Sequence, residues 1–317
     1  PRVHQAQVLE YNRGKMGVAA VPGSGKTQTL SYLAARLLAE GRVQDDQEIL
    51  VVTLVNSAVE NFSSRINGFV QEMGFIPGVG YRVRTLHGLA HDIIRERPDL
   101  VGLPNQFRII DENESKEILK DAVRTWLGMN STFAETYLKQ DIDSGQMNRV
   151  MTSFYELVVD ITDSFIRTAK DNEILPPQIR TKLDNLQVSQ PLLEMGWEIY
   201  RSYQRSLSYR SAVDFNDLIR LALLALQSDP DFLERLQRRW VYILEDEAQD
   251  SSLLQETILS MLAGSDGNWV RVGDSNQAIF ETFTTANPKY LVNFLNTRGV
   301  IRRELPTSGR STPSIIW

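Results

Sequence analysis

The sequence contains no cysteine. Without cysteine it forms neither a disulfide framework nor a thiolate metal site, which fits a protein of the cytoplasm. No stretch approaches the roughly 20 consecutive apolar residues that a membrane-spanning helix needs. No basic segment precedes a short apolar run, as it does in a signal peptide. We therefore expect a cytoplasmic protein that has no membrane partner.

An excess of positive charge is also absent. The 34 lysines and arginines are outnumbered by 40 aspartates and glutamates, which gives a net charge of -6. A surface that is basic all over is therefore disfavoured, but a local basic groove can still hold nucleic acid. Hydrophobic residues make up 42% of the 317 residues, an ordinary globular composition with room for two or three domains.

Short apolar runs alternate with helical patterns in two parts of the chain. Buried strands are expected at residues 16–21, 48–55, 81–86, 241–246, 269–274 and 300–305. The first three are each followed by apolar residues at helical spacing. Strand alternating with helix predicts an α/β fold, in which helices flank a parallel sheet.

Between these two parts the pattern is almost wholly helical. The best strand candidate in this region is FRII, residues 107–110. We interpret the region as an all-helical subdomain that is inserted into the α/β domain. The expected boundaries are 1–97 and 209–305 for the α/β domain, 98–208 for the insertion, and 306–317 for the start of a further lobe.

The last residues, STPSIIW, have the features of a first helical turn: a serine or threonine cap, an early proline and then apolar residues. A helix that begins and then stops is typical of a fragment. We expect the sequence to be the front part of a longer protein.

The segment AVPGSGKT, residues 20–27, follows a predicted strand and begins a helix. Gly23 and Gly25 let backbone N–H groups close around phosphate oxygens, and the helix N-terminus adds a favourable dipole. Lys26 is placed to reach the β and γ phosphates, and Thr27 to hold Mg²⁺. The pattern departs from a full phosphate-loop motif at Ala20, where glycine is usual.

Two further polar segments come at the ends of predicted strands. In LEDEAQD, residues 244–250, Asp246 is suited to hold Mg²⁺ and Glu247 to polarise the water that attacks ATP. In VGDSNQAIF, residues 272–280, Asp274 and Gln277 stand where strand ends face the nucleotide in such sheets.

Taken in order, these and other segments resemble the motifs of the UvrD/Rep-type superfamily 1 DNA helicases. The matching segments run from residue 4 to residue 316: HQAQVL, AVPGSGKT, VVTLVNSAVENFSSRI, RTLHGLA, DFNDLI, EDEAQDSSLLQ, VGDSNQAIF and GRSTPSII. The resemblance implies a RecA-like P-loop NTPase lobe with a helical insertion. It also implies an ATP hydrolase that uses ATP and Mg²⁺ as cofactors.

The resemblance assigns nucleotide roles residue by residue. The expected nucleotide-binding residues are Gln5, which reads adenine, and Pro22, Gly23, Ser24, Gly25, Lys26, Thr27 and Gln28. The expected Mg²⁺ ligands are Thr27 and Asp246. The expected catalytic residues are Lys26, Glu247, Gln277 and Arg310.

The resemblance also implies that ATP drives movement along single-stranded DNA in the 3′ to 5′ direction, on single strands or at a junction with duplex. Proteins that bind single-stranded DNA in this way stack the bases on aromatic side chains and also contact the DNA phosphates. The residues expected to contact DNA are Thr53, Asn56, Thr85, His87 and Phe283. The oligomeric state is left open.

Three positions depart from the family pattern. Gly309 stands where a tyrosine usually stacks on adenine, and Gln28 stands where an arginine usually covers the other face of that base. Leu54 replaces an aromatic residue on the DNA side. We therefore expect Gln5 to hold the adenine more than a stacked pair does.

Two alternative functions stay open at this point. The chain could be the motor part of a helicase–nuclease, which a nuclease domain beyond residue 317 would reveal. It could also be a nucleotide-dependent DNA-binding protein that does not unwind DNA. The leading hypothesis is an ATP-dependent DNA helicase or translocase.

Overall fold

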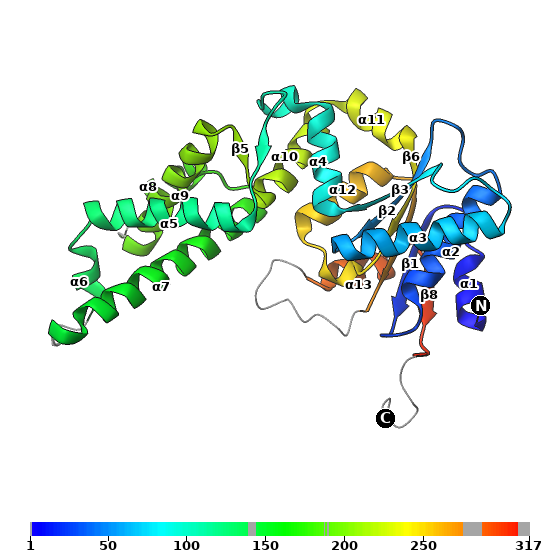
Figure 1. Cartoon of the computed structure of the whole chain (residues 1–317), viewed down its shortest axis with the longest axis horizontal. Helices are drawn as coiled ribbons and strands as arrows, with labels where there is room; N and C mark the ends of the chain where they lie inside the picture. The colour runs from blue at the N-terminus through cyan, green and yellow to red at the C-terminus, as the bar shows by residue number, and fades with distance from the viewer. Residues whose placement is uncertain (1, 139–143, 187, 189, 275–286, 310–317) are drawn as a thin grey trace. The chain divides into compact units, whose positions relative to one another are not determined.

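The structure is a computed structural model, and it describes residues 2–138, 144–186, 188, 190–274 and 287–309. The chain forms two compact units (Figure 1). The first unit combines Pro1–Leu100 with Ala222–Trp317, and the second is Val101–Leu221. The helical insertion that the sequence predicts over residues 98–208 lies mostly in the second unit, which also takes in the first half of helix α10 (Phe215–Ser228).

A six-stranded parallel sheet forms the centre of the first unit. Its strand order is β3-β2-β6-β7-β1-β8, and every pair of neighbours is parallel. All six predicted strands are present, with ends that differ by one or two residues from those expected. Their bounds are β1 Lys15–Ala20, β2 Glu48–Thr53, β3 Tyr81–Thr85, β6 Trp240–Glu245, β7 Asn268–Gly273 and β8 Ile301–Leu305.

Side chains of the strands alternate between two covered faces. On β1, Met16 and Val18 join a core that also contains residues of three helices on one face of the sheet. Gly17 points to the other face, where a Cβ atom would lie 2.6 Å from Leu295. Because both faces are covered, the strands are apolar runs, as expected for a parallel sheet. The helices of the first face are α1 Val3–Leu9, α2 Lys26–Ala39 and α3 Asn56–Glu72.

The remaining helices of the first unit begin where the sequence supplies a cap or a proline. Thr85 caps α4 (Leu86–Glu96), and its hydroxyl accepts a hydrogen bond from the Gly88 N–H. Asp229 caps α11 (Pro230–Arg239) in the same way, and proline is the first residue of that helix. The first unit also contains helices α12 (Leu253–Ala263) and α13 (Lys289–Asn296). Short 3-10 turns are η1 (Pro98–Val101) and η2 (Ala248–Asp250).

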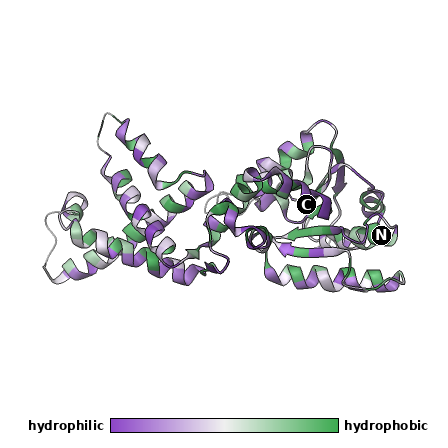
Figure 2. Cartoon of the chain, turned by 90° about the horizontal axis from the view of Figure 1, so that it is seen from above, coloured by the Kyte–Doolittle hydropathy of each residue, from purple (hydrophilic) through white to green (hydrophobic). Residues whose placement is uncertain are grey.

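The second unit is built from helices with one apolar face each, which gather around a core of their own (Figure 2). It differs from an all-helical subdomain in one respect: FRII forms strand β4 (Arg108–Ile109), which pairs with β5 (Ala212–Val213). The helices of the second unit are α5 Glu112–Met129, α6 Phe133–Tyr137, α7 Ser144–Asp171, α8 Pro176–Asp184 and α9 Pro191–Tyr209.

In the ranges that the structure describes, no helix is long and apolar enough to cross a membrane.

A buried charge cluster ties α7 to the DFNDLI segment inside the second unit. Lys170 Nζ, which is fully buried, lies 2.5 Å from Asp214 Oδ2 and 2.7 Å from Asp217 Oδ2. Tyr203 on α9 donates a further hydrogen bond to Asp214. Burial alone would raise the pKa of Asp217, but the cations of Lys170 and Arg220 outweigh burial and hold that pKa below its ordinary value. The cluster therefore joins α7 to the DFNDLI segment through ion pairs, and α9 to the same segment through the neutral Tyr203 hydroxyl.

Replacing Lys170 by methionine is expected to destabilise this unit by about 3–5 kcal/mol, because two buried carboxylates lose their cation. Hydrogen exchange of the α7 and α9 amides measures the loss for this unit by itself. The matched control is Lys182→Met, at an exposed lysine on α8, which should change protection little. Equal protection in the two variants would show that the cluster contributes nothing to stability.

Candidate nucleotide site

The glycine-rich loop lies between β1 and α2, as the sequence predicts. Gly23 and Gly25 both have positive φ angles, 72° and 88°, and Gly25 caps the helix. A Cβ atom on Gly25 would also lie 2.7 Å from the amide nitrogen of Gln5. Only glycine meets both requirements at position 25. The N–H groups in the first turn of α2 have no carbonyl partner within the helix, and such groups can bind an anion.

The loop lines a cavity of about 570 Å³. Its wall contains every residue that the sequence assigns to the nucleotide, together with Glu247. It also contains three residues that were not predicted from the sequence: Arg2, directly before α1, and the neighbours Asn61 and Arg65 on α3. The full lining is Arg2, Gln5, Pro22, Gly23, Ser24, Gly25, Lys26, Thr27, Gln28, Asn61, Arg65, Glu247 and Gly309.

Asn61 and Arg65 are four residues apart on α3, and Arg65 Nε donates to Asn61 Oδ1 at 2.6 Å. This spacing places both side chains on the same face of the helix. The sequence contains that signal, but only the packing of α3 against α2 directs the face toward the loop. Arg65 is one of three cationic side chains in the wall, with Arg2 and Lys26.

Lys26 and Glu247 meet in this cavity although 221 residues separate them. Lys26 Nζ donates to Glu247 Oε2 at 2.5 Å, and the side chains are 10% and 34% exposed. Glu247, the second residue after the end of β6, has a left-handed backbone with a φ of 53°. This conformation is uncommon for a residue with a side chain. The cation expected at the phosphates and the carboxylate expected at the attacking water are therefore neighbours.

Asp246 lies at the end of β6, where its N–H donates to the Val52 carbonyl at 2.9 Å. Burial, together with the nearby Glu247 carboxylate, raises the pKa of Asp246 to about 7. Its Oδ1 atom is buried and has no hydrogen-bond partner among the described residues. A carboxylate oxygen of this kind fits the oxygen shell of Mg²⁺, because a nearby cation offsets the cost of burying its charge.

Gln249 links the ends of two strands at the site. It is 4% exposed. Its amide donates to Glu247 Oε2 at 2.9 Å, and its carbonyl oxygen accepts from the Asp274 N–H at 3.0 Å. A Cβ atom on Gly273 would lie 2.5 Å from that oxygen. Glycine at the end of β7 therefore leaves room for the Gln249 side chain to come this close to the backbone. No role for Gln249 was predicted from the sequence, because Asp274, the partner that ties it to the second strand, is 25 residues away in the chain.

A second buried cluster supports the strand that carries Asp246. Arg271 on β7 is fully buried and stacks on Trp269, 4.7 Å from the ring centroid. Its guanidinium donates to Glu256 at 2.7 Å and to Glu245 at 3.3 Å. Glu245 directly precedes Asp246, so this ion pair fixes the last residue of β6 relative to β7.

The residues expected to contact DNA lie at the neighbouring strand ends. Thr53 and Thr85 are partners in the register of β2 and β3. Thr53 is only 3% exposed, and the Thr85 hydroxyl caps α4. Thr53, His87, Asp246 and Glu247 all line one small cavity of about 40 Å³. Asn56 is the first residue of α3 and does not line that cavity.

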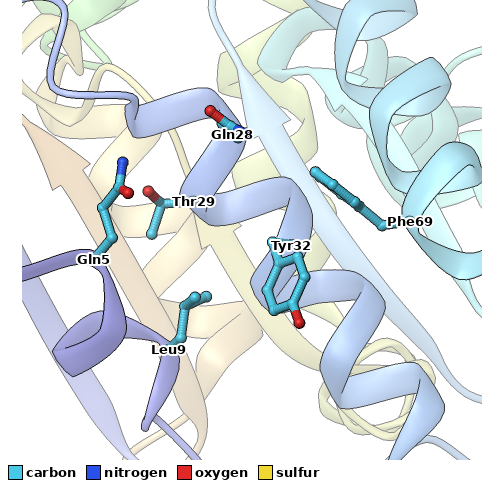
Figure 3. Close-up of a pocket in the computed structure, with 6 residues that line it drawn as sticks. All are labelled: Gln5, Leu9, Gln28, Thr29, Tyr32 and Phe69. Carbon is cyan, nitrogen blue, oxygen red and sulfur yellow. The ribbon is translucent and has the colours of Figure 1, made fainter. Parts of the chain in front are cut away.

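An apolar cavity of about 180 Å³ adjoins the nucleotide cavity and shares two wall residues with it, Gln5 and Gln28 (Figure 3). The rings of Tyr32 on α2 and Phe69 on α3 pack edge to face, with centroids 5.2 Å apart. Leu9 and Thr29 complete its wall. This cavity was not predicted from the sequence, since its residues come from three helices.

Three expected site residues lie outside the described residues. They are Gln277 and Arg310, expected in catalysis, and Phe283, expected in DNA binding. Their assignments stay predictions.

A glycine loop between a strand and a helix, with an acidic pair at the end of a nearby parallel strand, defines a P-loop nucleotide-binding domain of the RecA-like type. The chain belongs to the UvrD/Rep helicase family, because the sequence model of the UvrD/REP helicase N-terminal domain matches residues 2–298. The family resemblance seen in the motifs and the predicted RecA-like fold are both confirmed.

Similar proteins carry the name ATP-dependent DNA helicase PcrA. The protein from Staphylococcus epidermidis is 29% identical over 276 residues, which cover 87% of this chain and 33% of that protein. The protein from Leuconostoc citreum is 29% identical over 290 residues, covering 92% of this chain and 34% of that protein. The chain thus spans about a third of the length of the curated relatives it matches.

Proposed function

We propose that the chain is the ATP-binding part of an ATP-dependent DNA helicase that moves 3′ to 5′ along single-stranded DNA. The observation that carries this proposal is the meeting of Lys26 and Glu247, 2.5 Å apart, in the wall of the cavity that the glycine loop lines. Membership of the UvrD/Rep helicase family supports it, as do relatives named as ATP-dependent DNA helicases.

In this proposal the first turn of α2 and Lys26 hold the phosphates of ATP. Glu247 orients and polarises the attacking water, and Gln249 holds the Glu247 carboxylate in place. Thr27 and Asp246 hold Mg²⁺, which when bound neutralises charge on the phosphates. Mg²⁺ fits here because the Asp246 Oδ1 atom has no protein partner in the described part of the chain.

The remaining roles follow the family pattern. Gln5 binds the adenine, and Gln277 and Arg310 complete the catalytic set. Single-stranded DNA, or a junction with duplex, lies across the ends of β2 and β3 and contacts a polar set with one aromatic residue: Thr53, Asn56, Thr85, His87 and Phe283. Because Thr53 and His87 share a cavity with Asp246 and Glu247, a change at the nucleotide reaches the DNA side over a short distance. The protein acts in the cytoplasm.

Neither alternative from the sequence is favoured. The sequence model that matches the chain is that of a helicase domain, and the relatives described above are named as helicases.

The full-length protein should hydrolyse ATP faster when single-stranded DNA is present, and should unwind a duplex that carries a 3′ single-stranded tail. Steady-state ATPase and strand-displacement assays measure the two effects. A duplex with a 5′ tail is the control and should stay paired. The affinity of the protein for single-stranded DNA should fall steeply as the salt concentration rises, because contacts to DNA phosphates release counterions. Nucleotide-dependent binding without displacement would refute unwinding, and shortened DNA would indicate the helicase–nuclease alternative.

A further inference from the structure

The segment that follows β8 runs beside the glycine loop. Val21 N–H donates to the Leu305 carbonyl at 3.1 Å, and Gly309 N–H donates to the Gly23 carbonyl at 2.8 Å. Gly309 therefore stands beside Gly23 in the middle of the loop, and it lines the nucleotide cavity. Its φ angle does not lie in the left-handed region, so the backbone alone does not require glycine there.

The space beside Gly309 is filled by Arg2. A Cβ atom on Gly309 would lie 2.5 Å from Arg2 Nη2, 3.2 Å from Nη1 and 3.3 Å from Cζ. All three distances are to the planar guanidinium, so any side chain at position 309 would displace that group. Arg2 and Gly309 are thus a matched pair, although they lie near opposite ends of the sequence.

Contacts on both sides hold Arg2 in this position. Its backbone N–H donates to Gln5 Oε1 at 2.9 Å, and its Nη1 donates to the Thr307 carbonyl at 3.2 Å. Gln5 in turn donates to the Ser24 carbonyl at 3.1 Å. Among the described residues the guanidinium has no carboxylate partner, and the side chain is exposed. Its plane is therefore oriented, charged and open to a ligand.

The contacts also place Arg2 at a particular end of the cavity. Arg2 bonds to Gln5, the residue expected to bind the adenine, and Gly309 bonds to Gly23 in the middle of the loop. Glu247 bonds to Lys26, where the terminal phosphates are expected. If Gln5 binds the adenine of such a nucleotide, Arg2 lies beside the base.

We propose that Arg2 stacks its guanidinium on the base of bound ATP, and that Gly309 is glycine so that Arg2 can do so. An arginine plane binds an aromatic face through cation–π attraction and stacking. This inference rests on the proposed function, because it assumes that the cavity holds ATP. It adds a base-contacting residue to a site where Gln28 and Gly309 both lack a stacking side chain.

The apolar cavity of Figure 3 is the other place where a base could bind. Its two aromatic rings, Tyr32 and Phe69, already pack against each other edge to face. No residue of the glycine loop lines this apolar cavity, although Gln28, the residue directly after the loop, does. The Arg2 side of the nucleotide cavity is therefore the better place for a base whose phosphates lie on the loop.

The test compares two ligands, a non-hydrolysable ATP analogue and inorganic tripolyphosphate, on the full-length protein. Arg2→Ala should bind the ATP analogue roughly 5-fold to 30-fold more weakly, since one stacking contact is lost. Tripolyphosphate, which has no base, should bind as it does to the unchanged protein. Arg2→Lys should resemble Arg2→Ala, because lysine keeps the charge and can still donate to Thr307 but has no plane.

Two further variants complete the test. The double variant Arg2→Ala with Gly309→Tyr should regain affinity for the ATP analogue, because an aromatic ring at position 309 enters the space that Arg2 leaves. Tyr32→Ala, in the cavity of Figure 3, should bind the analogue normally.

Three results would overturn the inference while the proposed function stands. In the first, Arg2→Lys binds like the unchanged protein, so charge and not stacking is what matters. In the second, tripolyphosphate weakens as much as the ATP analogue, so Arg2 contacts phosphate. In the third, Tyr32→Ala loses affinity and Arg2→Ala does not, so the base binds in the other cavity. If the unchanged protein binds no nucleotide, the proposed function itself fails.

Discussion

Replacing Lys26 by alanine should almost abolish ATP binding. Lys26 is 10% exposed and is the cation nearest to Glu247 in the cavity wall. Removing one partner of such a desolvated charge contact costs about 2–5 kcal/mol, which is roughly a 30-fold to 5,000-fold loss of affinity. Titration of the full-length protein with a non-hydrolysable ATP analogue measures the loss, and hydrolysis and DNA unwinding should disappear with it.

The fold should survive this change, because Glu247 is 34% exposed and its carboxylate can be hydrated when its partner is gone. Circular dichroism of the variant checks this point. Lys182→Ala, at an exposed lysine of the second unit, is the matched control and should bind normally. If Lys26→Ala binds the analogue as tightly as the control does, the loop is not a phosphate site and the proposed function is wrong.

Replacing Glu247 by glutamine should keep ATP binding and remove turnover. Glutamine has nearly the same shape and can still accept the hydrogen bond from Gln249. It no longer polarises water, and loss of a positioned general base costs about 10²–10⁴ in rate. Affinity should not fall, because Lys26 loses a competing carboxylate and is left to the phosphates. Single-turnover hydrolysis, measured together with the affinity for an ATP analogue, separates the two effects.

Glu72→Gln is the matched control for this variant, since Glu72 is exposed at the end of α3. It should hydrolyse ATP at the normal rate. Turnover by Glu247→Gln within a few-fold of this control would remove Glu247 from the reaction. A loss of affinity as large as that of Lys26→Ala would instead give Glu247 a role in binding.

Much of the fold could be predicted because its signals are local. The strand predicted over 48–55 and found at Glu48–Thr53 is an apolar run, and a helix such as α2 repeats its apolar residues every three or four positions. The glycine loop is also local, because positive φ angles at Gly23 and Gly25 depend on those residues themselves. Strand β5, with only two residues, is too short to produce a pattern, and it was not predicted.

Parts of the candidate site were beyond prediction for a physical reason. Gln249 gains its position from Asp274, at the end of another strand and 25 residues away in the chain. Arg271 is a charged residue inside an apolar strand, and only its partners Glu245 and Glu256 explain its burial. In each case the decisive contact joins residues whose separation in the chain says nothing about their distance in space.

The sequence by itself determined most of the strands and helices and the place of the glycine loop, since these depend on residues that are neighbours in the chain. It also determined the family, because the motifs follow one another in the family's order along the chain. Only the tertiary structure decided the strand order β3-β2-β6-β7-β1-β8, and that order brings Lys26 to Glu247 across 221 residues. The tertiary structure also placed the Arg2 guanidinium against the Thr307 carbonyl, 305 residues away in the chain. The physical reason is that periodicity and turn chemistry act over a few residues, whereas a site forms where packing brings distant strand ends and helix ends together.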